Sequence, residues 1–126
     1  MSLWSRLYAV CAAAIVALGV LHMVTTFRLS SLTPAGKVWF FGSGIALALM
    51  GILNLLNRRY GLAASGLRAA CIASNVVLLC FAVIAGRLTG ATAVEQVVLA
   101  SVLLLALILS ALRSASLGRH QDTAPS

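Results

Sequence analysis

One segment, from Thr33 to Arg59, has the features of a complete membrane-spanning helix. Thr33 is a good N-cap, and the proline after it occupies the first helical position, where a missing N–H costs nothing. The stretch from Gly42 to Leu56 carries no charge, two arginines close the segment, and Gly61 predicts the helix stop. At ~1.5 Å rise per residue this helix is about 39 Å long, enough to cross a ~30 Å hydrocarbon core. A chain that contains such a helix is expected to fold in a bilayer.

The composition predicts the same class of protein. Of the 126 residues, 62% are hydrophobic and only 9% are charged, whereas a soluble domain has about 25% charged residues. A soluble chain this short could not bury so much apolar surface, because small domains bury the smallest fraction of theirs. The sequence therefore predicts an integral membrane protein with a single domain.

The sequence contains four apolar segments of this kind, which predict one transmembrane domain over 1–113. The four helices are expected at about 7–27, 34–59, 66–86 and 92–113. The first segment is too long for the apolar part of a signal peptide and is not followed by a small-x-small cleavage site. The motif TAVE at the start of the fourth has the form of a capping box. The last residues, 114–126, are small and polar, which predicts a disordered tail.

The predicted fold class is all-α: an integral membrane four-helix bundle in up-down-up-down order, because such short connections join antiparallel neighbours. The side that holds both termini carries more basic residues than the other. The side with the termini holds Arg6, Arg58, Arg59, Arg68, Arg113 and Arg119. The opposite side holds Arg28, Lys37 and Arg87. Basic residues collect on the cytoplasmic side, so both termini are expected there. The expected location is a bacterial inner membrane, crossed several times.

The remaining composition argues against several classes of function. The net charge of +7 is scattered between apolar runs without a basic stripe, so we predict no nucleic-acid partner. Cys11, Cys71 and Cys80 lie in apolar runs without a CxxC motif and are expected to be small buried hydrophobes. No P-loop, dinucleotide fingerprint, HExxH or nucleophile elbow is present. We therefore predict no catalytic residue, no metal site and no cofactor, and we match the chain to no family.

Two ionisable side chains, His22 and Glu95, are candidates for ligand binding or proton relay. Both are expected near the outer ends of their helices, at similar depth, where a His–Glu pair could tune proton uptake. Each also has a purely structural interpretation. His22 would be an interfacial histidine hydrogen-bonded to a neighbouring helix, and Glu95 would cap its helix, three residues after Thr92. With one histidine in the spans, a single chain cannot supply bis-histidine haem ligation.

Asparagines and small residues form a second group of candidates. Asn54 and Asn75 are expected in the inner halves of their helices, close enough to approach each other. Buried asparagines hydrogen-bond across helices for about 1 kcal/mol or less, and the alternative is a polar lining for a small cavity. Asn57 and Tyr8 are expected at the membrane interface, as is Trp4.

Three small residues share one face of the second helix and predict close packing, either inside the bundle or in a homodimer. They are Gly44, Ala48 and Gly51.

Three functions of different class remain open. The first, which we favour, is a non-enzymatic membrane component that acts through helix–helix interaction with a second copy or with another membrane protein. The second is a small transporter, or a module that binds a lipid or small molecule, using His22 and Glu95. The third is a membrane redox or enzyme subunit with His22 as a ligand. The last two require polar groups that these spans supply sparingly.

Overall fold

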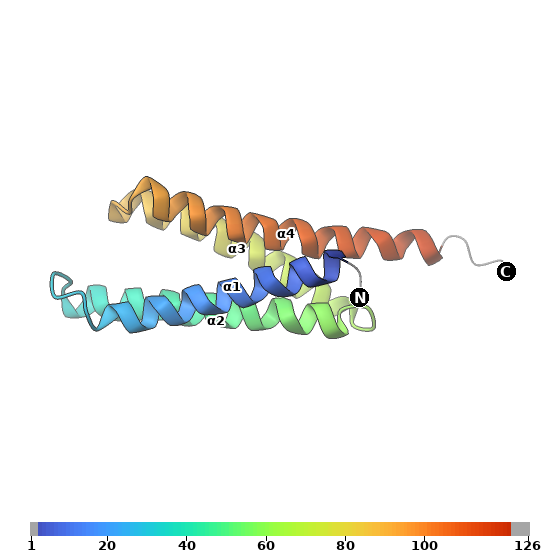
Figure 1. Ribbon diagram of the computed structural model, residues 1–126, viewed down its shortest axis with the longest axis horizontal. Coiled ribbons are helices and arrows are strands. Elements are labelled where there is room, and N and C mark those ends of the chain that lie inside the picture. The colour runs from blue at the N-terminus through green and yellow to red at the C-terminus, as the bar shows by residue number, and fades with distance from the viewer. Residues whose placement is uncertain (1–2, 122–126) are drawn as a thin grey trace.

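The computed structural model describes residues 3–121 of the chain, with side chains over 3–112, and this part of the protein contains four helices (Figure 1). They are α1 (Leu3–Thr26), α2 (Pro34–Tyr60), α3 (Ser65–Thr89) and α4 (Ala93–Gln121). All four are long and apolar enough to cross a membrane. The prediction of an all-α fold with four helices of membrane-spanning length is confirmed.

The helix ends follow from local chemistry. Thr33 Oγ1 accepts a hydrogen bond of 3.1 Å from the Gly36 amide, so the predicted N-cap of α2 is confirmed. Gly90 ends α3 with a φ of 68°, a left-handed conformation that suits glycine. Gly61 follows α2 with a φ of −62°, so its conformation does not require glycine. Glycine is needed there because a Cβ would collide with the side-chain oxygen of Asn57.

The first and last helices extend beyond their expected limits. α1 begins at Leu3 and not near Leu7, since residues 3–7 contain no proline or glycine that would stop the helix. α4 continues to Gln121, past Arg113, where the sequence predicts its end. Residues 114–121, which we expected in a disordered tail, are therefore helical. Their alanine and leucine support a helix, and no proline occurs among them. The rest of the expected tail, 122–126, lies outside the described residues.

The four helices form two antiparallel hairpins, α1–α2 and α3–α4 (Figure 1). The hairpins meet at one end of the molecule and diverge toward the other. We call the first the closed end; it holds Leu3 and the α2–α3 connection, 61–64. We call the second the open end; it holds the connections 27–33 and 90–92. The arrangement therefore differs from an evenly packed bundle, because the hairpins separate along their length.

Direct contact between backbones holds the α1–α2 hairpin together. A Cβ on Gly19 would lie 2.5 Å from the Ala48 nitrogen, and a Cβ on Gly44 would lie 2.7 Å from the Gly19 oxygen. A Cβ on Gly51 would likewise lie 2.7 Å from the Ala12 oxygen. Such close approach is what small residues at helical spacing permit. The face of α2 that carries these small residues is therefore packed against α1 of the same chain.

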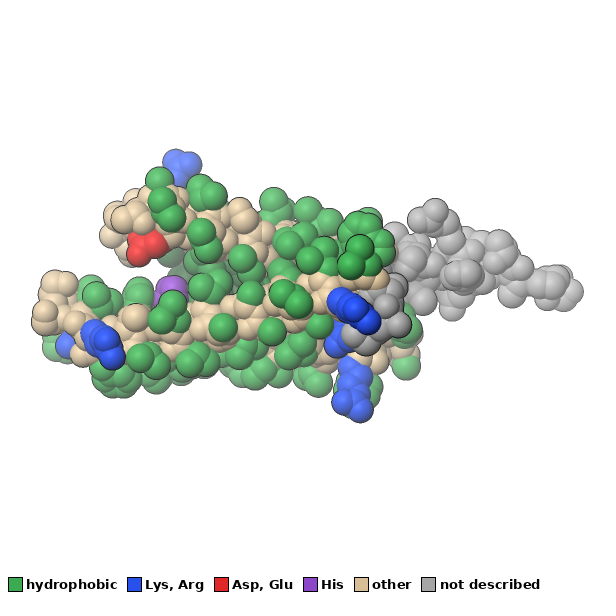
Figure 2. Space-filling model, in the orientation of Figure 1, with side chains coloured by type: hydrophobic (Ala, Val, Ile, Leu, Met, Phe, Trp, Pro, Cys, Tyr) green, Lys and Arg blue, Asp and Glu red, His purple; other side chains and the backbone are tan. Residues whose placement is uncertain are grey.

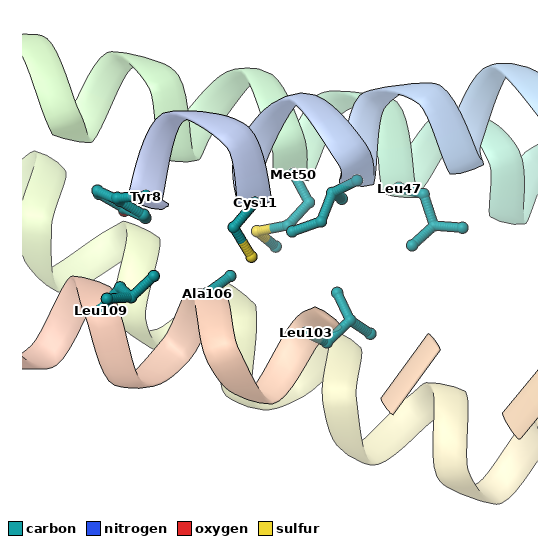
Figure 3. Packing of buried hydrophobic residues seen from close by; sticks show 8 residues of the cluster. Tyr8, Cys11, Leu47, Met50, Leu103, Ala106 and Leu109 are labelled. Atoms are coloured by element: carbon teal, nitrogen blue, oxygen red, sulfur yellow. The ribbon is translucent and has the colours of Figure 1, made fainter. Parts of the chain in front are cut away.

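The apolar core joins the two hairpins in the middle of the molecule (Figure 3). Its buried members come from α1, α2 and α4, and partly buried leucines of α3 pack against them. These members are Tyr8, Cys11, Ile15, Leu47, Met50, Leu103, Ala106 and Leu109. Cys11 and Cys71 are buried as expected, whereas Cys80 is exposed on α3. The expectation of burial is wrong for Cys80, because only part of each helix surface faces the other helices.

Candidate functional site

The divergence of the hairpins leaves a cleft at the open end (Figure 2). The space-filling view shows the two hairpins separated there and joined by side chains toward the closed end. The floor of the cleft is formed by the buried core residues that lie nearest the open end. They are Ile15 of α1, Leu47 of α2 and Leu103 of α4. The walls are the facing surfaces of apolar helices. The cleft therefore lies at the open end and is closed toward the other end of the molecule.

His22 lies on the α1–α2 side of this cleft, and its ring is held in place by two contacts. Its Nδ1 lies 3.2 Å from the Leu18 oxygen, and the ring stacks on Phe40 with 4.7 Å between the centroids. Because a carbonyl oxygen can only accept, Nδ1 must carry the proton of this bond. The other ring nitrogen, Nε2, forms no hydrogen bond within the described residues. In the neutral ring, Nε2 is therefore an acceptor that a ligand can use.

Glu95 lies on the opposite hairpin and forms the predicted capping box of α4. Its Oε2 accepts from the Thr92 amide at 2.9 Å and from the Thr92 hydroxyl at 2.8 Å. The Glu95 amide donates in return to Thr92 Oγ1 at 3.3 Å. Both bonds go to one carboxylate oxygen, and within the described residues the other oxygen accepts none. Capping of α4 therefore uses one oxygen of the Glu95 carboxylate and leaves the other oxygen available.

His22 and Glu95 lie on opposite hairpins, both toward the open end of the molecule. Figure 2 shows the histidine in purple on one hairpin and the acidic side chain in red on the other. A protonated His22 ring and the Glu95 carboxylate would attract each other weakly at this separation. The sequence places them at similar depth on α1 and α4, and the structure adds that the space between them is open.

Three basic residues lie at the same end of the molecule as the cleft. Arg28 lies in the α1–α2 connection, Lys37 in the first turn of α2 and Arg87 in the last turn of α3. The two arginines are exposed and Lys37 is half-buried. Together with Glu95, they give the open end a net positive charge and one local negative group. The open end of the molecule thus carries a carboxylate, an imidazole and three cationic side chains.

The asparagines lie in a separate buried cluster near the closed end. Asn54 and Asn75 exchange hydrogen bonds between their amide groups, at 3.2 and 3.1 Å, and so join α2 to α3. Tyr8 of α1 donates to Asn54 Oδ1 at 2.9 Å and accepts from Asn57 Nδ2 at 3.0 Å. Cys71 donates weakly to the same Asn54 oxygen at 3.4 Å. Three helices therefore meet at one amide, in the arrangement of a helix-to-helix contact.

Two members of this cluster, Tyr8 and Asn57, which we expected at the membrane interface, are buried inside the protein. Tyr8 is only 2% exposed and Asn57 only 1%. The spacing of Asn54 and Asn57, three residues apart, was the available signal, because it places both on one helix face. Asn57 Oδ1 is buried against Gly61 and accepts no hydrogen bond within the described residues.

Neither the cleft nor the cluster has the composition of a metal site. Within the described residues, no three His, Cys, Asp or Glu side chains are grouped as metal ligands. Comparison of the chain with protein-family models, with curated proteins and with solved structures gives no match. The fold and the cleft define a class: a small protein of four apolar helices, compatible with a multi-pass membrane protein.

The capping box provides a mild test of Glu95. We expect Thr92→Val to lower the free energy of unfolding by about 1 kcal/mol, because it removes both hydroxyl bonds at the start of α4. Glu95→Gln should cost no more, since the amide oxygen can still accept from the Thr92 amide. Thermal unfolding in detergent measures both. A large loss of stability for Glu95→Gln alone would mean that its carboxylate does more for folding than capping.

Proposed function

We propose that this chain is a multi-pass protein of a bacterial inner membrane that binds one bilayer lipid in the cleft between its hairpins. Both termini would lie in the cytoplasm, so the cleft would open in the outer leaflet; the excess of basic residues on the side of the termini supports this orientation. The observation that carries the proposal is the cleft itself, with apolar walls and with His22 and Glu95 at its mouth.

A lipid is the occupant that best suits such walls. Apolar surfaces hold water poorly, so a cleft between apolar helices inside a bilayer is filled by hydrocarbon. Glu95, Leu99 and Leu103 lie four residues apart along one face of α4, from the mouth of the cleft to its floor. That distance is about 12 Å, close to the ~15 Å depth of one leaflet. An acyl chain in the cleft would therefore place its headgroup near His22 and Glu95.

The closed end favours binding over transport. Below the floor of the cleft, the apolar core fills the space between the hairpins, and the Asn54 cluster joins three helices beyond it. A transported molecule would have to separate both layers. The redox or enzyme alternative needs more ligands than His22 and one carboxylate can supply. Among the three functions, the lipid-binding module uses the most features of the structure.

Helix–helix interaction stays the second candidate. The small-residue face that favoured it contains Gly44, Ala48 and Gly51, and this face is packed against α1. A partner would instead have to insert a helix into the cleft, which is apolar enough to accept one. A partner helix and a lipid would compete for the same space, so one experiment can separate the two candidates.

The test is native mass spectrometry of the full chain released from lipid nanodiscs. We expect one phospholipid per chain in the wild type and loss of that lipid in Leu99→Trp, because the indole would fill the cleft. Leu99 is partly buried against the core on the cleft side of α4. Leu104→Trp is the matched control, since Leu104 is exposed on another face of the same helix.

The outcomes are distinct. Lipid retained by the wild type and by Leu104→Trp, and lost from Leu99→Trp, supports the proposal. A wild type without lipid, or equal retention by both variants, contradicts it. A lipid-free dimer that Leu99→Trp dissociates would show that a second copy occupies the cleft.

A further inference from the structure

The groups at the mouth of the cleft define what kind of headgroup they can bind. His22 Nδ1 is used by the Leu18 carbonyl, so the neutral ring offers only the lone pair of Nε2 to a ligand. Glu95 Oε2 is used by Thr92, so its free oxygen offers lone pairs and a negative charge. The positions that these two groups leave free for a ligand accept hydrogen bonds and donate none. A complementary ligand must supply N–H or O–H donors, preferably with positive charge.

The basic residues at the same end define a second requirement. Arg28, Lys37 and Arg87 belong to both hairpins and lie at the open end of the molecule. Cationic side chains at the headgroup level attract phosphate, which arginine in particular binds with paired N–H groups. A ligand that satisfies the whole opening therefore carries an anionic phosphate and, beside it, a donor-rich cation.

We propose that the lipid held in the cleft is a phospholipid with a primary ammonium headgroup, whose N–H groups are bound by Glu95 and His22. Its phosphate lies toward the basic residues of the open end, and its acyl chain lies on the apolar walls. This inference rests on the proposed function, because it names the class of lipid that the same cleft takes.

A methylated headgroup nitrogen distinguishes hydrogen bonding to the ammonium from attraction of the cleft for any zwitterionic headgroup. A trimethylated ammonium keeps its charge but has no N–H to donate. It can still be attracted to the Glu95 carboxylate, but it cannot hydrogen-bond to His22 Nε2 or to the free Glu95 oxygen. An anionic phospholipid with a glycerol headgroup keeps the phosphate and offers neutral O–H donors, but it has no cation that Glu95 can attract. The three headgroups on identical acyl chains thus compare a charged N–H donor with a charge that has no donor and with neutral donors.

The experiment is competitive lipid binding, measured by native mass spectrometry of the full chain. The nanodiscs contain equal amounts of phosphatidylethanolamine, phosphatidylcholine and phosphatidylglycerol with identical acyl chains. We expect the wild type to retain phosphatidylethanolamine about tenfold over phosphatidylcholine, the factor that one charge-assisted hydrogen bond provides. Glu95→Gln should reduce this preference to about twofold, because the charge is lost while the side chain keeps its shape.

Two further variants assign the preference to the two acceptors. His22→Phe keeps a ring that can stack on Phe40 but removes Nε2, so the preference should fall. Thr92→Val removes the two hydroxyl bonds of the cap but leaves the carboxylate, so the preference should persist. If Thr92→Val abolished the preference as fully as Glu95→Gln, the cap and not the carboxylate would determine it, against the proposal.

Failure of this inference can be told apart from failure of the proposed function. Equal retention of all three lipids, or a preference for phosphatidylglycerol, would overturn the ammonium assignment and leave lipid binding in the cleft intact. Absence of any retained lipid would overturn both. A phosphatidylethanolamine preference that survives Glu95→Gln and His22→Phe together would also overturn the assignment, because other groups would then recognise the headgroup.

Discussion

Replacing Gly51 by valine is expected to disrupt the α1–α2 hairpin and destabilise the fold by about 3 kcal/mol, the upper part of the range for overpacking a tight contact. A Cβ at this position would lie 2.5 Å from Val16 Cγ2 and 2.7 Å from both the Ala12 oxygen and the Val16 nitrogen. Two of these atoms belong to the backbone of α1, so the clash can be relieved only by moving the helices apart. Thermal unfolding in detergent and limited proteolysis measure the effect.

Gly42→Val is the matched control for this substitution. Gly42 lies on the same helix, and a Cβ there would meet no atom within 4 Å. Both variants exchange the same residue types, so any difference in helix propensity cancels. Equal stability of the two variants would mean that α1 and α2 are not in backbone contact near Gly51.

Replacing Asn54 by leucine is expected to have the second largest effect, about 2 kcal/mol lost from the free energy of unfolding. Asn54 Oδ1 accepts from Tyr8, Cys71 and Asn75, and its amide donates to Asn75. Removal of this amide leaves buried donors without an acceptor, and each such group costs about 1–3 kcal/mol. Chemical or thermal unfolding of the detergent-solubilised protein gives the value.

A second substitution separates lost hydrogen bonds from altered packing. Adding Asn75→Leu to Asn54→Leu removes the polar partner on α3 as well, so the double variant should recover part of the stability. A double variant that is destabilised by the sum of the two single changes would show that the amides act independently. The asparagine pair would then not link α2 to α3.

The helices could be predicted because their determinants are local. Apolar runs between charges, the Thr33 cap and the TAVE motif each depend on residues close together in the chain. The approach of Asn54 and Asn75 was predictable for a similar reason, since the order of the helices places both near the same end. The continuation of α4 beyond Arg113 was not predicted, because small polar residues are compatible with either a helix or a tail.

The cleft and the burial of Tyr8 could not be predicted, because both depend on how the hairpins dock. A tyrosine near a helix end is equally suited to an interface or to a buried hydrogen bond, and only the position of α1 against α2 and α3 decides between them. His22 and Glu95 were predicted at similar depth. Their separation by an open cleft follows from the angle between hairpins, which no short stretch of sequence encodes.

The most direct test of the central claim is the separation of the hairpins in a bilayer. Spin labels on ketone-bearing amino acids, which leave the native cysteines intact, would be placed as two pairs in nanodisc-embedded protein. One pair is at Ser31 and Thr89 at the open end, and the other is at Leu7 and Leu112 near the closed end; all four positions are exposed. Double electron–electron resonance should give a clearly longer distance for the open-end pair, as the diverging hairpins require. Equal distances in the two pairs would mean that the hairpins pack along their whole length, and the lipid-binding cleft would not exist.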